Sequence, residues 1–470
     1  GVLAACLIAG CSRSPEPEEK AAASPTPIPP PTADCAVAPT MVQLSPQIPC
    51  DVSVAANSNT LDQIQHDFDV YSWNTFIAVN WPPDGTGKIG QNGDNPTVWE
   101  SWKESNDIFL PGGAKPSPFG APGELPAACQ GKLEPGLRVV TQIGKTPTLL
   151  EEDVQPFKTG PLVDQHGQYT RFEILVNEDM FETILDNQLY NQQGQQAYAK
   201  AGKSVQFDCG SNQPVQVGAM MVKAAWKILG EGEDPARFHK ADALVYTPTA
   251  KNPAEICVRK KLGLVGLHVA HKTADAPQWI WSTFEQVDNV PEQGQTPSGR
   301  YNYFNAACKD CPVNEPPPRP WDPTRPGQPA TQVVREIPID EATIQLNQTA
   351  TNLLKGVSPS SVWQFYELVS TQWPTQPASS QTFCPAPGSA GPTLQEVQSE
   401  TDGNPAPQFL ANATLETFVQ GTVPNSSSSC IRCHHAATAT TGETSDFTYL
   451  LERAKSVVVP PPAGDGGSRP

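Results

Sequence analysis

Runs in which apolar or β-branched residues alternate with polar ones predict most of the regular structure of this chain, because that period of two is typical of strands. Six such runs stand out between residues 137 and 373. The expected strands are LRVVTQI from Leu137, RFEILV from Arg171, ALVYTP from Ala243, ICVRKKLGLVGLHVAH from Ile256, QWIWSTF from Gln278 and SVWQFYELVSTQW from Ser361.

Helical spacing is rarer. It predicts helices around NQQGQQAYAKA from Asn191, MVKAAWKIL from Met221 and LETFV from Leu415. In SDFTYLLERAKS, apolar residues fall at i, i+3, i+4 and i+7 from Phe447, and Ser445 is placed to cap the start. The fold class expected is therefore mainly β (α+β), with a short helical segment at the C-terminal end.

The 51 prolines and 35 glycines require long loops between these elements. Composition changes along the chain mark six parts. They are a signal remnant (1–10), a tether rich in Pro, Ala and Glu (11–34), a β-rich body (35–311), a Pro-rich crossing (312–332), a C-terminal part (333–459) and a tail (460–470).

The first residues indicate export. GVLAACLIAGC is apolar and too short to span a bilayer, as in the core of a signal peptide. Residues 7–11, LIAGC, resemble a bacterial lipobox, in which Cys11 is lipidated, and the polar tether behind it suits an anchored domain. Ser12 then favours the outer membrane by analogy with known lipoproteins. The alternative is an apolar terminus with an incidental cysteine.

Twelve cysteines support the same compartment. Cys6 falls in the leader and Cys11 at the lipidation site. Eight others form an even set that suggests up to four disulfides, with the pairing left open. They are Cys35, Cys50, Cys129, Cys209, Cys257, Cys308, Cys311 and Cys384.

The last two cysteines lie in CIRCHH, which has the C-x-x-C-H spacing of c-type haem attachment. Two thiols one helical turn apart add to the two vinyl groups of haem, and the next residue ligates the iron. We therefore expect Cys430 and Cys433 to carry one covalent haem c and His434 to be the proximal ligand. A disulfide or zinc pair is the alternative, although zinc would need a second pair of ligands. CKDC at Cys308 lacks the histidine and suits a disulfide better than a second haem.

The sixth iron ligand decides between an electron carrier and an open reaction centre. All four methionines precede the motif, and the only histidine after His434 is its neighbour His435. Any protein ligand on the distal side must then come from the body. His268 and His271 in GLVGLHVAHKT are the candidates, and on a strand they face opposite sides. We expect His268 rather than His271, because His268 shares its face with Gly266. Both are equally compatible with a structural role.

Other methionines and histidines are weaker candidates for the sixth iron ligand. Methionine in GAMMVKAAW is more often core filling than a ligand. The histidines in polar contexts have no sequence feature that favours them as iron ligands. These residues are Met220 and Met221 among the methionines, and His66, His166 and His239 among the histidines.

The net charge of −18 makes binding to nucleic acid or to anionic lipid heads unfavourable and favours a basic protein partner. DGTGKIG lacks the spacing of a phosphate-binding loop, and neither H-E-x-x-H nor G-x-S-x-G occurs. Trp73, Trp226, Trp279 and Trp281 lie in core-like runs, so we expect them to be buried rather than to form a sugar-binding surface.

The stretch CIRCHHAATATTGETSDFTYLL resembles the C-terminal end of several c-type cytochrome families, among them small β-sheet cytochromes that include cytochrome c prime-beta and hydroxylamine-oxidising members. The whole chain is similar to larger bacterial cytochrome c family lipoproteins, through WNTFIAVNWP from Trp73, VKAAW from Val222, GLHVAHKT and QWIWSTFEQVDN. The second resemblance implies export and haem binding only. Hydroxylamine-oxidising members cross-link a lysine to the haem, and no lysine here matches that role.

These features together predict an exported, lipid-anchored monohaem cytochrome, facing the periplasm or the cell surface, that transfers electrons to or from a basic redox partner. The lipid would be its only membrane attachment. Its large size leaves two alternatives. One is a haem enzyme or small-gas sensor with an open iron position, acting on peroxide, nitric oxide or hydroxylamine. The other is a binding or structural lipoprotein with an accessory haem.

Overall fold

The computed structural model describes most of the chain from Cys35 onward. The described residues are 1, 35–85, 88–90, 95–123, 125–132, 138–140, 159–247, 250–297, 299–319, 321–322, 329–385, 391–423 and 427–458. The predictions for the leader, for lipidation at Cys11, for the tether and for the tail fall outside them.

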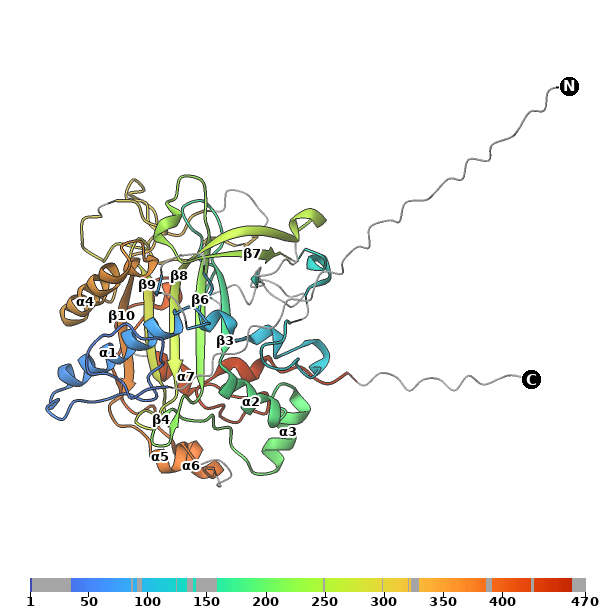
Figure 1. The fold of residues 1–470 in the computed structure, drawn as a ribbon, viewed down its shortest axis with the longest axis vertical. Helices are drawn as coiled ribbons and strands as arrows, with labels where there is room; N and C mark the ends of the chain where they lie inside the picture. Colours follow the sequence, from blue (N-terminus) through green and yellow to red (C-terminus); the bar gives the residue numbers. More distant parts are fainter. Residues whose placement is uncertain are drawn as a thin grey trace.

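One nine-stranded sheet forms the centre of the fold (Figure 1). Its main path is β1-β3-β6-β8-β9-β10-β11, while β7 pairs with the first half of β8 and β2 pairs in parallel with β7. The strands are β1 (Lys103–Glu104), β2 (Arg138–Val140), β3 (Arg171–Val176), β6 (Met220–Ile228), β7 (Lys240–Tyr246), β8 (Cys257–His271), β9 (Ile280–Gln286), β10 (Tyr366–Pro374) and β11 (Pro405–Ala406). The short pair β4 (Ser211–Asn212) and β5 (Val215–Gln216) lies apart from it.

The predicted β-rich class is confirmed, and each of the six runs contains a strand. Only residues 138–140 of the run from Leu137 are described, and they form β2. In the run from Ser361 the first residues form a 3-10 turn, and β10 begins at Tyr366. Because β10 pairs with β9 along its length, the body and the C-terminal part share one sheet.

The helices of the described residues lie around this sheet. They are α1 (Leu61–Val79), α2 (Glu178–Asp186), α3 (Gln192–Lys200), α4 (Glu341–Val357), α5 (Ser380–Phe383), α6 (Leu394–Ser399) and α7 (Cys430–His435). The helix predicted from Asn191 is α3, and Asn191 caps it by accepting a hydrogen bond from the backbone N–H of Gly194.

The segment from Met221 was predicted to be a helix, and that prediction is wrong because it forms β6. Alternate residues of β6 point to opposite faces, and both faces are covered, so Val222 and Ala224 are as buried as Met221. A strand buried on both sides has no polar face, and its apolar run could not be told from a buried helix by spacing.

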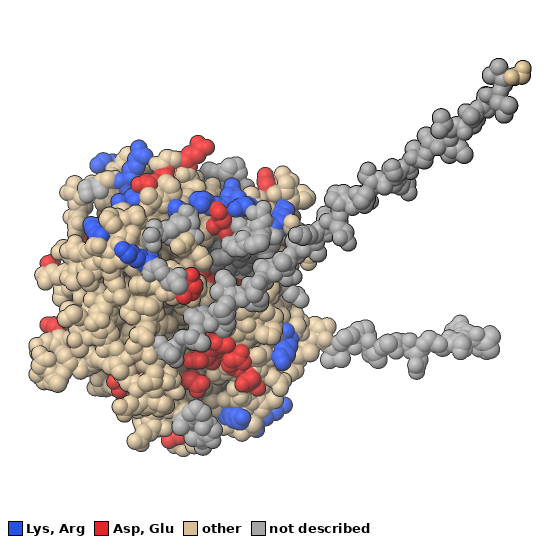
Figure 2. All heavy atoms as spheres, viewed as in Figure 1, with Lys and Arg blue, Asp and Glu red and all other residues tan. Residues whose placement is uncertain are grey.

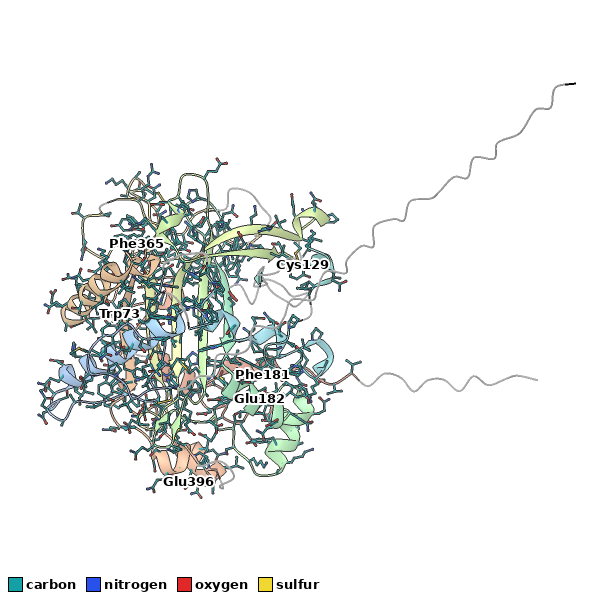
Figure 3. All side chains as sticks on the ribbon, viewed as in Figure 1. Trp73, Cys129, Phe181, Glu182, Phe365 and Glu396 are labelled. Carbon is teal, nitrogen blue, oxygen red and sulfur yellow. A yellow bond between two sulfur atoms is a disulfide. The ribbon has the colours of Figure 1, made fainter. Side chains whose placement is uncertain are left out.

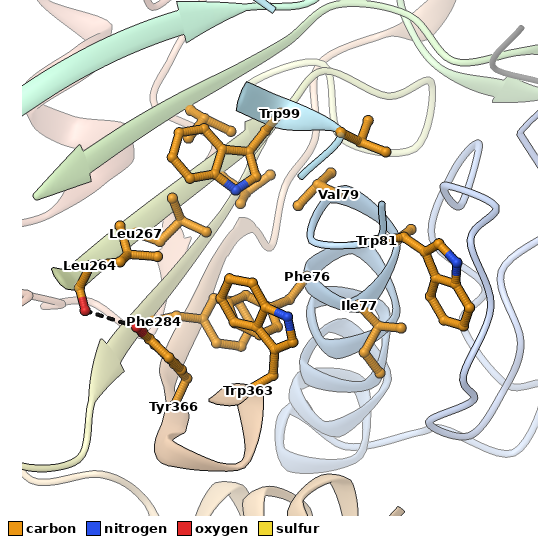
Figure 4. Close-up of a cluster of buried hydrophobic side chains, with 14 of the residues drawn as sticks. Phe76, Ile77, Val79, Trp81, Trp99, Leu264, Leu267, Phe284, Trp363 and Tyr366 are labelled. Atoms are coloured by element: carbon orange, nitrogen blue, oxygen red, sulfur yellow. Dashed lines mark hydrogen bonds between the residues drawn. The ribbon is translucent and has the colours of Figure 1, made fainter. Parts of the chain in front are cut away.

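Helices α1 and α4 cover one face of the sheet. From Phe68 to Val79 every residue of α1 is buried. Trp73, labelled on α1 in Figure 3, packs against Phe284 of β9, and so does Phe76 (Figure 4). At the far end of this core the hydroxyl of Tyr366 donates to the carbonyl oxygen of Leu264 over 2.9 Å (Figure 4). The tryptophans predicted to be core residues are indeed buried.

The C-terminal end is less helical than predicted. The run from Leu415 contains only a 3-10 turn at Thr417–Val419, and the run from Ser445 contains one at Tyr449–Arg453. Ser445 is not its cap, because the Ser445 hydroxyl donates to the carbonyl of Thr448. Thr448 takes that role by accepting from the backbone N–H of Leu450.

Four disulfides are present, as the even cysteine count had predicted. The pairs are Cys35–Cys50, Cys129–Cys257, Cys209–Cys384 and Cys308–Cys311. Cys129–Cys257 ties the loop at Cys129 to the start of β8 (Figure 3). No described helix combines the length and the apolar character that crossing a membrane requires.

Candidate functional site around Cys430, Cys433 and His434

The second face of the sheet, opposite α1 and α4, is covered by the C-terminal segment. Lys223 of β6, His268 of β8 and Thr283 of β9 are direct neighbours across three strands and form one row on this face. Ile431 of α7 packs into the same apolar cluster as Trp281 of β9 and Met221 of β6. The C-x-x-C-H motif therefore packs on this face of the sheet, with α7 in contact with β10.

Helix α7 is held on the sheet by the side chain of Gln372 in β10. Its Oε1 atom accepts from the backbone N–H of Ile431 over 2.8 Å and from the hydroxyl of Ser429 over 3.2 Å. Ser429 is the N-cap residue of α7, yet its side chain makes no cap hydrogen bond. Ser429 therefore provides no side-chain cap for α7. The glutamine satisfies the first turn instead.

Cys430 and Cys433 are the only described cysteines outside disulfides, and both are half-buried. Three residues apart on one helix, their side chains lie on the same side of α7. Burial raises the pKa of Cys430 well above that of an ordinary thiol, and the carboxylate of Glu416 acts in the same direction. These two side chains are therefore neutral thiols held on one face of one turn.

His434 follows them and its ring is fixed on several sides. Its Nδ1 atom lies 2.8 Å from the carbonyl oxygen of Phe447 and donates to it, because a carbonyl accepts only. The ring centroid is 4.3 Å from that of Trp281 and 5.4 Å from that of Tyr449. Burial lowers the pKa of His434 to about 4, so the imidazole is neutral at pH 7. Nε2 is then the bare nitrogen, the tautomer that metal ligation requires.

His268 lies on the same face of the sheet as His434. Its Nε2 atom is 2.9 Å from Oε1 of Glu416, and both side chains are about one-sixth exposed. Although burial alone would raise the pKa of Glu416, His268 and Lys223 lower it below its ordinary value, so the group is a carboxylate. Burial in turn lowers the pKa of Lys223. Lys223 and Glu416 thus both lie beside His268, with which they form one polar cluster on this face.

His271 lies on the opposite face, as the strand alternation predicted. Its Nδ1 is hydrogen-bonded to the hydroxyl of Tyr71 in α1, and its Nε2 to the carbonyl of Val217 over 2.5 Å. Burial lowers its pKa to about 4. Both ring nitrogens of His271 are hydrogen-bonded on the α1 side of the sheet. His271 therefore has a structural role there and is separated from His434.

The other methionines and histidines that were considered as iron ligands lie at several places in the fold. Met221 is on the His434 side, where the hydroxyl of Thr448 lies 3.8 Å from its sulfur, whereas Met220 belongs to the core under α1. His239 is buried against Trp363 and lies 3.1 Å from Glu100. His166 is half-exposed beside Glu233, and His66 is on the outside of α1. His435 is exposed, and its Nε2 is 3.0 Å from the carbonyl of Glu400.

No group of three or more His, Cys, Asp or Glu side chains that could hold a metal ion exists among the described residues. The donor set at α7 suits a different kind of site, in which a cofactor attached to two thiols brings its own metal and needs one imidazole from the chain. Cys430, Cys433 and His434 supply those three groups.

Sequence reasoning missed four contributors to the site: Lys223, Trp281 as a contact of His434, Glu416 and the carbonyl of Phe447. Lys223 and Trp281 would have followed from the strand register, which places them beside His268 and Ala270. Glu416 and Phe447 lie in irregular segments, and no periodic signal points to them.

No family model matches the chain, and no curated protein or solved structure matches it either.

Proposed function

We propose that this chain is a monohaem c-type cytochrome that carries electrons, with haem c attached through Cys430 and Cys433 and ligated by His434. The observation that carries the proposal is the pairing state of the cysteines from Cys35 onward, all of which the structure describes: eight are joined in disulfides, and the two left free are the two of the C-x-x-C-H motif. The neutral His434, with Nδ1 committed to Phe447 and Nε2 bare, supplies the matching ligand.

When bound, the haem would supply a one-electron couple. The residues around it hold and tune it. Gln372 positions the helix that carries the thiols, Trp281 and Tyr449 pack against the imidazole, and the carbonyl of Phe447 accepts a hydrogen bond from its Nδ1–H. A hydrogen bond of this kind strengthens the imidazole as a donor and so favours ferric over ferrous iron.

A basic redox partner fits the surface next to the motif. Figure 2 shows Asp and Glu side chains gathered over α2, which carries Glu178, Glu182 and Asp186. Phe181 of the same helix (Figure 3) belongs to the apolar cluster that contains Ile431, so α2 and α7 are linked through one apolar cluster. Complementary charge there would steer a cationic partner toward it. Export with a lipid anchor at Cys11, on the outer membrane, remains part of the proposal.

A second function is favoured by one contact. The leading candidate for the distal ligand, His268, has its Nε2 engaged with Glu416. If that pair persists in the loaded protein, the iron keeps an open position beside a histidine–carboxylate pair that can exchange protons. The chain would then be a haem enzyme or small-gas sensor.

Visible spectra of the exported protein, oxidised and reduced, with and without carbon monoxide, separate the two functions. An electron carrier gives low-spin bands that carbon monoxide leaves unchanged, and an open iron gives high-spin bands that shift. Cys430→Ser with Cys433→Ser should abolish the haem spectrum. The matched control, Cys308→Ser with Cys311→Ser, should retain it. Haem kept by the first double variant would contradict the proposed attachment.

A further inference from the structure

The two residues before Thr448 have an unusual backbone conformation. Asp446 and Phe447 both have positive φ, 51° and 63°, although neither is a glycine. Consecutive left-handed residues with side chains are unfavourable, and they persist only where their surroundings fix them. This turn presents the carbonyl oxygen of Phe447 to Nδ1 of His434. The strained segment is therefore the one that orients the imidazole.

A buried ion pair fixes this turn. Nζ of Lys272, directly after β8, lies 2.6 Å from Oδ2 of Asp446, and the two side chains are 0% and 2% exposed. The same oxygen accepts from the backbone N–H of Phe207 over 2.7 Å, and Nζ also donates to the side chain of Gln206 over 2.8 Å. Asp446 is thus held from two other segments of the chain.

Such a pair is poor evidence for stability, because the cost of removing both charges from water offsets most of their attraction. What the ion pair supplies is a single fixed position for the side chain of Asp446. The carboxylate has two fixed donors, so the peptide that follows it has little freedom to turn its carbonyl away from His434. Neither Lys272 nor Asp446 has a hydrogen bond to His434 itself.

We infer that Lys272 and Asp446 are positioning residues for His434: they hold the Asp446–Phe447 turn so that Nδ1 of His434 carries the proton and Nε2 is left as the metal-binding nitrogen. The inference rests on the proposed function for its biological meaning. The geometry it predicts is a property of this chain alone.

The direct test is the tautomer of His434, read from ¹⁵N chemical shifts. It is measured in the full exported chain carrying Cys430→Ala and Cys433→Ala, which cannot attach haem. We expect the Nδ1–H form alone in this background and a mixture of both tautomers after Lys272→Gln or Asp446→Asn. Lys227→Gln is the matched control, because Lys227 is equally buried, 3.7 Å from Asp164, and has no link to the turn. It should keep the single tautomer.

The reduction potential of the haem-loaded protein gives a second readout. Loss of the Nδ1–H bond weakens the imidazole donor, so both variants should raise the potential. Through-space charge alone would give opposite signs, a fall when the cation is removed and a rise when the anion is removed. A single tautomer in both variants, or potential shifts of opposite sign, would overturn the inference.

These outcomes are distinguishable from failure of the proposed function. A wild-type chain without haem contradicts the cytochrome proposal, whereas the tautomer comparison still decides the role of the pair. If Asp446→Asn does not fold, the same comparison between Lys272→Gln and Lys227→Gln decides it.

Discussion

His268 and Glu416 are joined by a hydrogen bond of 2.9 Å on the face of the sheet that carries the C-x-x-C-H helix. Lys223 stands directly opposite His268 on the neighbouring strand. The leading candidate for a second iron ligand is therefore already bound to a carboxylate, and ligation through Nε2 would require that bond to break. In the proposed cytochrome, this pair would decide whether the iron has one protein ligand or two.

The first prediction concerns the distal ligand. If the loaded protein is low-spin, His268→Ala should convert it to a high-spin form that binds carbon monoxide, because the sixth ligand is lost. The visible spectrum measures this change. His271→Ala is the control from the other face of the sheet and should leave the bands unchanged. Identical low-spin spectra for wild type and His268→Ala would exclude His268 as the ligand.

The same control variant carries a prediction of its own about stability. His271 is 1% exposed and joins α1 to the sheet through Tyr71. Removing it leaves a cavity and two buried polar groups without partners. We expect His271→Ala to lower the free energy of unfolding by about 3 kcal/mol. Urea denaturation measures this loss, and a value near zero would mean that the buried contact is not formed.

A buried ion network near the end of β9 leads to a further stability prediction. Arg335 lies 3.1 Å from Glu285 and 3.0 Å from Glu367, and Glu285 is fully buried. Arg335→Met should destabilise the fold by about 3–5 kcal/mol, because it leaves the buried carboxylate of Glu285 without its charged partner. The exposed pair of Arg259 and Asp242 is the comparison, and Arg259→Met should change stability by about 1 kcal/mol or less. Equal losses in urea denaturation would contradict this difference.

The pH dependence of stability should carry a contribution from Asp51. Burial raises its pKa from 3.8 to about 7. Between those values the folded state binds a proton that the unfolded state does not, so this group makes stability fall as pH rises from about 4 to 7. The full effect is at most about 4 kcal/mol, at roughly 1.4 kcal/mol per pKa unit.

Asp51→Asn should remove that decline, and urea denaturation at several pH values between 4 and 8 would measure it. Asp62→Asn, at the exposed start of α1, is the control and should leave the slope unchanged. An unchanged slope in Asp51→Asn would mean that Asp51 ionises as it does in the unfolded chain.

The strands were predictable where β-branched and aromatic residues mark them, even where both faces are buried, as in β9. Residues 171–176 and 280–286 were recognised from their β-branched and aromatic runs. Helix α1 was missed because residues 68–79 are buried all round and show no polar stripe. Helix α4 was missed as well, although its buried positions from Thr343 to Leu354 recur at helical spacing.

The chemistry of the site was predictable only as far as it is local. Cys430, Cys433 and His434 lie within five residues, so their spacing alone proposes them as a haem attachment site. The opposite orientations of His268 and His271 followed from strand alternation. Other contacts of the site, such as those of Glu416 with His268 and of Trp281 with His434, join residues more than a hundred positions apart. Only the three-dimensional fold brings them together.

Covalent attachment of haem is the central claim, and peptide mass mapping tests it most directly. The protein should be exported from a host that attaches c-type haem, purified and digested, and the peptide that contains Cys430 and Cys433 identified by its mass. The claim predicts that this peptide carries one haem through both cysteines, while Cys308 and Cys311 are found in a peptide joined by a disulfide. A haem-free peptide with Cys430 and Cys433 as thiols, or joined to each other, would contradict it.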